Sequence, residues 1–75
     1  GHEIYSVNRT IGGTPPPHPI LIGNNVWIGI NSVILKDTII GDNCVVSAGS
    51  IVKGHFPPNP LIQGNPAKIK KILTI

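Results

Sequence analysis

The sequence predicts an all-β fold, a parallel β-helix, from its repeats and its turn residues. The stretch 22–57 repeats every six residues, and turn formers recur within it, as in Gly23-Asn24-Asn25 and Gly41-Asp42-Asn43. A period of six fits neither an amphipathic helix nor a long alternating strand. A short extended segment followed by a turn accounts for it. The first position of every repeat is aliphatic: Ile22, Ile28, Ile34, Ile40, Val46 and Val52.

Three units of six residues that close a triangular turn make one coil of 18 residues. The β-branched residues of the extended segments are then expected to face a common interior. First-position residues eighteen positions apart are expected to stack in pairs: Ile22 on Ile40, Ile28 on Val46, and Ile34 on Val52. Such stacking of short units around one core is what fixed-period repeats predict.

One domain is expected over residues 1–75, in three parts. Residues 1–19 form an N-terminal segment that includes a short strand and a stiff proline-rich loop. Residues 20–57 form the coils, which the prolines from Pro57 onward are expected to end. Residues 58–75 form a short helical or extended tail, with a strand at Leu61–Gly64. In the helical form, Asn65 caps a helix that Pro66 begins, with one apolar face made by Ile69, Ile72 and Leu73.

The composition limits the classes of function. A chain of 75 residues builds a thin core, so oligomerisation is the expected source of further burial. Cys44 is the one cysteine and is interpreted as a packed thiol. The sequence shows no metal-ligand cluster, secretion signal or apolar run that could span a bilayer, so we expect a cytoplasmic protein. The basic tail lacks interleaved aromatics, which argues against nucleic acid and suits a phosphorylated cofactor.

The stretch of residues 20–72 resembles the C-terminal half of the hexapeptide-repeat acyltransferases. The segments NNVWIG, AGSIV and GNPAK carry this resemblance. The family includes galactoside, maltose, serine and xenobiotic acetyltransferases and the O-acetyltransferases of capsular and O-antigen sugars. The resemblance implies a single-stranded, left-handed coil and a homotrimer. It also implies that acetyl-CoA lies between neighbouring β-helices and that its acetyl group passes to a hydroxyl of a sugar or a similar small acceptor.

The resemblance also assigns catalytic roles. His2 matches the general base that removes the acceptor proton, although Gly1-His2 is also what cleavage of a tag leaves behind. His18 is a second candidate, interpreted more simply as a loop residue. His55 is interpreted as a surface or cofactor-side residue. The backbone amide of Ile30 falls where relatives stabilise the oxyanion.

The cofactor contacts implied by the resemblance fall into three groups. Trp27 either packs in the core or lies beside the cofactor arm. Ala48 and Gly49 match positions where a small side chain lets the pantetheine arm approach the backbone. Near the cofactor phosphates, or else in a solvated basic tail, the matching residues are Lys53, Lys68 and Lys71.

Two alternatives limit these assignments. Asp37 and Asp42 occupy turn positions, and Glu3 points away from His2 if that segment is extended, so we expect no carboxylate of this chain to orient the base. Relatives draw that partner and much of the acceptor pocket from upstream coils. This departure leaves open a non-catalytic β-helix that serves oligomerisation. A zinc enzyme of the β-helix type needs histidines on adjacent coils, and the three histidines lie outside the regular repeats.

Overall fold

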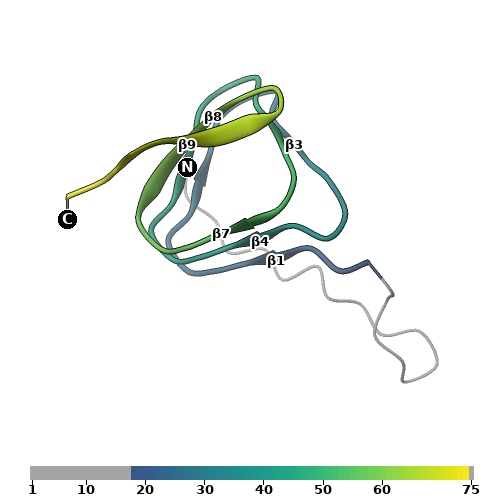
Figure 1. Cartoon of the computed structure of the whole chain (residues 1–75), viewed down its shortest axis with the longest axis horizontal. Coiled ribbons are helices and arrows are strands. Elements are labelled where there is room, and N and C mark those ends of the chain that lie inside the picture. Colours follow the sequence, from purple (N-terminus) through teal and green to yellow (C-terminus); the bar gives the residue numbers. More distant parts are fainter. Residues whose placement is uncertain (1–17, 75) are drawn as a thin grey trace.

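The computed structural model describes residues 18–74 of the chain. Figure 1 shows three coils that wind around one triangular interior. The described residues form nine strands and no helix, so no helix there could cross a membrane. The strands are β1 (Leu21–Ile22), β2 (Trp27–Ile28), β3 (Val33–Ile34), β4 (Ile39–Ile40), β5 (Val45–Val46), β6 (Ile51–Val52), β7 (His55–Phe56), β8 (Pro60–Gly64) and β9 (Ala67–Ile72).

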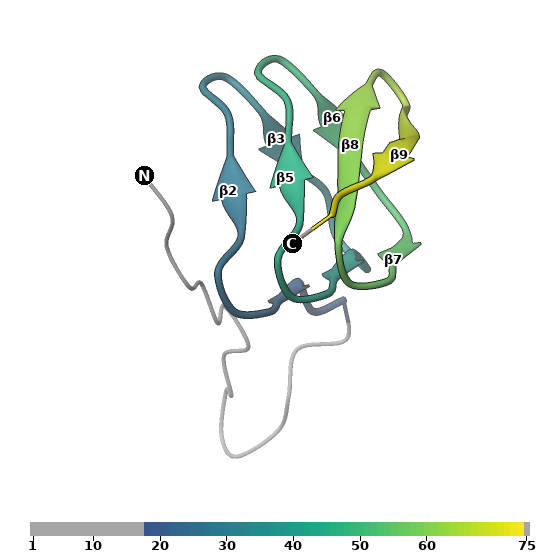
Figure 2. The ribbon, with the colours of Figure 1, turned by 90° about the vertical axis from the view of Figure 1, so that its left-hand side faces the viewer.

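Each side of the triangle is one sheet, and its strands come from successive coils, except that β9 turns back beside β8 (Figure 2). The first side has the order β1-β4-β7, the second β2-β5-β8-β9, and the third β3-β6. All neighbours are parallel except β8 and β9. The eighteen-residue stacking predicted from the sequence is confirmed, since the partners are Ile22 with Ile40, Ile28 with Val46, and Ile34 with Val52.

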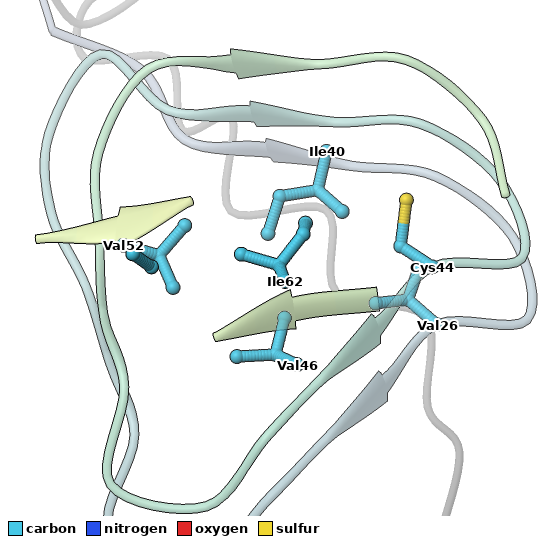
Figure 3. Packing of buried hydrophobic residues seen from close by; sticks show 7 residues of the cluster. Val26, Ile40, Cys44, Val46, Val52 and Ile62 are labelled. Atoms are coloured by element: carbon cyan, nitrogen blue, oxygen red, sulfur yellow. The ribbon is translucent and has the colours of Figure 1, made fainter. Parts of the chain in front are cut away.

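The core fills the interior of the triangle (Figure 3). Its buried hydrophobic members are Val26, Ile40, Cys44, Val46, Val52, Ile62 and Ala67. Two polar side chains are buried with them, and each donates a hydrogen bond to a carbonyl: Thr38 to Val52 at 3.2 Å and Ser50 to Ser47 at 2.7 Å. Small residues at the fifth position of the repeat therefore point inward beside the first-position aliphatics.

The expectation that all β-branched residues face the interior is wrong for the sixth position. Val33 and Ile39 are exposed on the outer surface. Each strand of the first two coils contains one sixth-position and one first-position residue. Because successive side chains of a strand point to opposite faces, only one of the two can enter the core.

The coil also continues beyond Pro57, where we expected it to end. Ile40 pairs with Phe56, and Val46 pairs with Ile62. These partners are 16 residues apart, because the corner Lys53-Gly54 between β6 and β7 has two residues where the matching corner between β3 and β4 has four. Gly54 takes a φ of 118° in this tight corner.

Proline is tolerated in the last coil because no further described coil is there to accept a hydrogen bond from an N–H at this position. The Gly23 N–H donates to the carbonyl of Ile40, and the Gly41 N–H donates to the carbonyl of Phe56, each one coil further on. Pro57 occupies the corresponding place in the last coil, and no further coil follows it within residues 18–74. Its missing N–H therefore costs no bond in the described part of the chain.

The helical form of the tail is also wrong. Residues 67–72 form β9, which pairs antiparallel with β8, whereas the strand predicted at Leu61–Gly64 is confirmed within β8. Gly64 takes a φ of 110°, and Asn65-Pro66 makes the turn between the strands. An edge strand is thereby paired and Ala67 is buried in the core. Neither would be available to an isolated helix of this length.

Candidate functional site

One face of the molecule combines an apolar end with a basic end. On the second side of the triangle, the paired residues are Trp27 with Val45, Val45 with Leu61, and Leu61 with Lys71. Paired residues point to the same side of a sheet. Val46 and Ile62, the neighbours of Val45 and Leu61, point into the core, so the row Trp27–Val45–Leu61–Lys71 lies on the outer surface. We call this row and the adjoining Gln63–Lys68 pair the outer row.

The repeat explains how the two ends of the outer row arise. Trp27 is a sixth-position residue, and its side chain is 48% exposed at the outer surface. The basic end comes from β9, where Lys71 lies opposite Leu61 and Lys68 lies opposite Gln63. The register shifts between Leu61 and Ile62, and Lys70 is the β9 residue that this shift leaves without a partner. The bulge therefore sets which lysines pair with residues of the outer row.

Ala48 and Gly49 lie at the exposed corner between β5 and β6. Gly49 takes a φ of 74°, and a Cβ placed there would meet no atom within 4 Å. The turn alone thus accounts for glycine at this position. The open space beside it is also what the expected approach of a cofactor arm needs.

Ile30 lies one coil before this corner and is 77% exposed. Its carbonyl accepts a hydrogen bond from the Gly49 N–H at 2.9 Å. This bond joins the expected oxyanion position to the expected pantetheine position. It engages the carbonyl of Ile30 and not its N–H, which is the group that oxyanion stabilisation requires.

The structure does not bring all three expected phosphate contacts together within one chain. Lys68 and Lys71 lie on the second side of the triangle. Lys53 lies at the corner between β6 and β7, which joins the third side to the first. In a triangle that corner is opposite the second side, so Lys53 and the outer row face away from each other.

His2, the expected base, lies outside the described residues. His18 is described, and its Nδ1 atom lies 3.1 Å from both carboxylate oxygens of Asp37. The expectation that no carboxylate orients the base is not tested for His2, and it does not hold for the second candidate, His18. Asp37 has a φ of 64°, so its interpretation as a turn former is also correct. The eighteen-residue repeat contained the missing signal, because it places residue 19 beside residue 37.

Metal ligands and the cysteine thiol are the remaining candidates for chemistry in the described part of the chain. Residues 18–74 contain no group of three or more potential metal ligands. Cys44 is buried, and its Sγ donates to the Pro57 carbonyl at 3.3 Å. Burial raises the pKa of this thiol, which makes it a packed side chain rather than a nucleophile, as interpreted from the sequence.

Comparison with known proteins matches this architecture to acetyltransferases. Residues 19–54 match the family described as bacterial transferase hexapeptide (six repeats). Over 69 residues the chain is 45% identical to the galactoside O-acetyltransferase of Escherichia coli K12, covering 92% of this chain and 34% of that protein. The chain thus spans about a third of the length of this curated relative.

Solved structures agree with this match. A maltose O-acetyltransferase from Clostridium difficile 630 superposes with a TM-score of 0.75 at 37% identity, over 96% of this chain and 42% of that one. A galactoside acetyltransferase in complex with coenzyme A gives a TM-score of 0.75 at 42% identity, over 99% of this chain and 36% of that one. These matches bear out the predicted fold, including the left hand of its coil.

Proposed function

Because residues 19–54 belong to the bacterial transferase hexapeptide family, we propose that this chain forms the acetyl-CoA-binding part of an O-acetyltransferase. The observation that carries the proposal is the outer row, which leads from Trp27 through Val45 and Leu61 to Lys71. Acetyl-CoA has a long pantetheine arm and a phosphorylated nucleotide at its end. A face with an apolar and a basic end suits both parts. A similar structure was solved with coenzyme A.

The proposed cofactor site involves a second copy of the chain. Lys68 and Lys71 share one face, whereas Lys53 lies at the opposite corner. A cofactor that contacts all three lysines would therefore lie between two copies, with Lys53 supplied by the neighbour. A homotrimer, as implied by the resemblance, supplies three such interfaces by closed symmetry. Ala48 and Gly49 would border the pantetheine arm at the exposed corner.

The proposed reaction is a direct transfer of the acetyl group. The acceptor hydroxyl oxygen attacks the thioester carbonyl carbon, the carbon–sulfur bond breaks, and coenzyme A leaves as a thiolate. His2 takes the hydroxyl proton as general base, and the Ile30 amide stabilises the oxyanion. A thiol with a pKa of about 8.5 gives a good leaving group, so no covalent enzyme intermediate is needed.

We propose a sugar or a similar small hydroxyl compound as the acceptor. The galactoside and maltose acetyltransferases found by comparison support this class without selecting one member. A bacterial, cytoplasmic enzyme is part of the same proposal.

Binding of coenzyme A tests the first part of the proposal. Coenzyme A is titrated into the chain by calorimetry and by thermal shift, since a ligand of the folded state raises the Tm. Lys71→Gln and Lys68→Gln are each expected to raise the Kd about three- to fivefold, the effect of losing one exposed charge contact of about 1 kcal/mol. Lys70→Gln is the matched control, because it removes the same charge from the same strand outside the outer row.

Turnover tests the second part. Thiol release from acetyl-CoA is followed with a panel of hydroxyl acceptors that includes methyl β-galactoside and maltose. His2→Ala is expected to lower kcat by about 10² to 10⁴, the usual contribution of a general base. A chain that neither binds coenzyme A nor turns over is a non-catalytic oligomerisation module. A Kd for coenzyme A that is unchanged in both Lys68→Gln and Lys71→Gln would refute the outer row as the cofactor site.

A further inference from the structure

The corner between β5 and β6 contains a carbonyl that accepts two side-chain hydroxyls. The Ser32 hydroxyl donates to the Ser47 carbonyl at 2.9 Å, from the preceding coil, and the Ser50 hydroxyl donates to the same carbonyl at 2.7 Å. No other carbonyl within residues 18–74 accepts two hydroxyls. Ser50 also accepts a hydrogen bond from the Gly64 N–H at 3.2 Å. The Ser47 carbonyl is therefore held from two coils, and Ser50 links it to the third.

These two bonds fix the direction of the amide that follows. Ser50 is buried and Ser32 is half-buried, so the Ser47 carbonyl points toward the interior of the corner. The C=O and N–H of a planar trans peptide point in opposite directions, so the Ala48 N–H points outward. Ala48 is exposed, and its N–H has no hydrogen-bond partner among the described residues. The corner thus presents a free backbone donor whose direction is set by two serines.

The first coil holds the same peptide from a second side. A Cβ on Gly29 would lie 2.7 Å from the Cα of Ala48 and 2.9 Å from the carbonyl carbon of Ser47, because the two coils are in direct backbone contact there. The Gly49 N–H, one residue further on, donates to the Ile30 carbonyl at 2.9 Å. The peptide cannot rotate without losing these contacts, so its N–H is preorganised for a ligand.

This corner adjoins the outer row. β5 begins at Val45, a member of the row, and leads directly into Ser47, while β8 ends at Gly64, next to Gln63 of the row. The pantetheine arm proposed to lie along this face contains amide carbonyls that need donors. Resting on the proposed function, we infer that Ser32 is a positioning residue. Together with Ser50, it turns the Ser47 carbonyl inward, so that the Ala48 N–H donates to an amide carbonyl of the pantetheine arm.

NMR spectroscopy tests the two hydrogen bonds on which this inference depends. The ¹³C shift of a carbonyl carbon rises when its oxygen accepts a hydrogen bond, so Ser32→Ala should lower the shift of the Ser47 carbonyl carbon. Ser32→Thr should restore it, since Thr38 has the same place in its repeat and donates to a carbonyl. Saturating coenzyme A should slow hydrogen exchange of the Ala48 amide at least about tenfold. An unchanged carbonyl shift in Ser32→Ala, or an Ala48 amide that coenzyme A does not protect, would refute the inference.

Calorimetric titration with coenzyme A tests the consequence for binding. Ser32→Ala should raise the Kd about fivefold, the effect of one neutral hydrogen bond, and Ser32→Thr should stay within about twofold of the wild type. Thr38→Val is the matched control, because it removes the hydroxyl bond to the Val52 carbonyl at the corner opposite the outer row. This control should lower the urea midpoint and leave the Kd within about twofold.

The outcomes separate this inference from the proposed function. A Kd that is unchanged in Ser32→Ala would overturn the positioning role of Ser32. An equal rise in Thr38→Val would also overturn it, because the effect would then follow general stability and not the corner. If the wild type binds coenzyme A and the lysine variants weaken it, either result removes this inference alone. A wild type that does not bind coenzyme A removes it together with the proposed function.

Discussion

The central coil and the last coil enclose the same triangle with different numbers of residues. From the first coil to the central coil, stacked partners are 18 residues apart, as for Ile22 and Ile40. From the central coil to the last, they are 16 apart, as for Ile40 and Phe56. The difference is confined to one corner, Lys53-Gly54. Stacking therefore requires only that each strand lie beside the matching strand of the previous coil. The number of residues in a corner can vary.

The two coils also differ in what must lie above them. A Cβ on Gly41 of the central coil would lie 2.7 Å from the Pro58 backbone nitrogen, because the last coil packs directly on it. Pro57, which follows Phe56 as Gly41 follows Ile40, has no such coil above it among the described residues. Glycine is thus required at position 41, where the backbone of the next corner packs against it. Proline appears where the stack of coils ends and β9 closes it.

Truncation of core residues gives the largest effect and tests whether the irregular last coil is a full part of the core. Ile62 lies in the last coil and Ile40 in the central coil, and both are buried. We expect either change to alanine to lower the free energy of unfolding by about 3 kcal/mol. Ile22→Ala, at a half-buried position of the first coil, should cost about half as much. Urea unfolding measures all three, and a cost near zero for Ile62→Ala would show that the last coil does not cover the core.

Most of the regular part of this fold could be predicted from the sequence. The six-residue period predicts the triangle and the pairs of stacked residues, because the aliphatic side chains that recur at the first position gain free energy by sharing one interior. It could not predict that the sixth position faces outward, since both positions of each strand are apolar in composition. The six-residue period also did not predict the shortened corner. If every repeat is given six residues, Gly54-His55-Phe56-Pro57 does not fit the pattern and is interpreted as the end of the coil.

The candidate site was predictable only in part. The family resemblance assigned Trp27, Ala48 and Lys71 to a cofactor face, and pairing places Trp27 and Lys71 on one surface. The separation of Lys53 from that face depends on which corner it occupies, and a linear sequence does not show this. The His18–Asp37 contact joins residues 19 positions apart in sequence. To predict this contact, the stacking of coils has to be applied to polar residues as well as to the core.

Glycine substitutions sharpen the comparison of corners. Gly41→Ala should cost about 2 to 3 kcal/mol, since the added Cβ meets the backbone of Pro57 and Pro58, which cannot move aside as a side chain would. Gly49→Ala should cost about 1 kcal/mol, because its Cβ meets open space and only the positive φ is unfavourable. Thermal or urea unfolding measures both. Equal costs would mean that coil contact does not set the glycine requirement.

The smallest expected effect concerns Cys44, whose thiol donates to the Pro57 carbonyl of the last coil. Burial raises the pKa of this thiol, so the native state retains the proton at a pH where the unfolded chain releases it. Stability is therefore fully present below the unfolded thiol pKa of about 8.5 and falls as the pH rises above it, by up to about 1.4 kcal/mol per pH unit.

The matching variant is Cys44→Ala, compared with the wild type by urea unfolding from pH 7 to 10. The variant should lose about 1 kcal/mol at pH 7, because the removed sulfur leaves a small void. The two curves should then converge as the pH rises, because only the wild type carries the thiol. Lysine titration affects both proteins equally and cancels in the difference. Parallel curves would mean that the thiol reaches solvent, and hence that the last coil does not seal the corner of the central one.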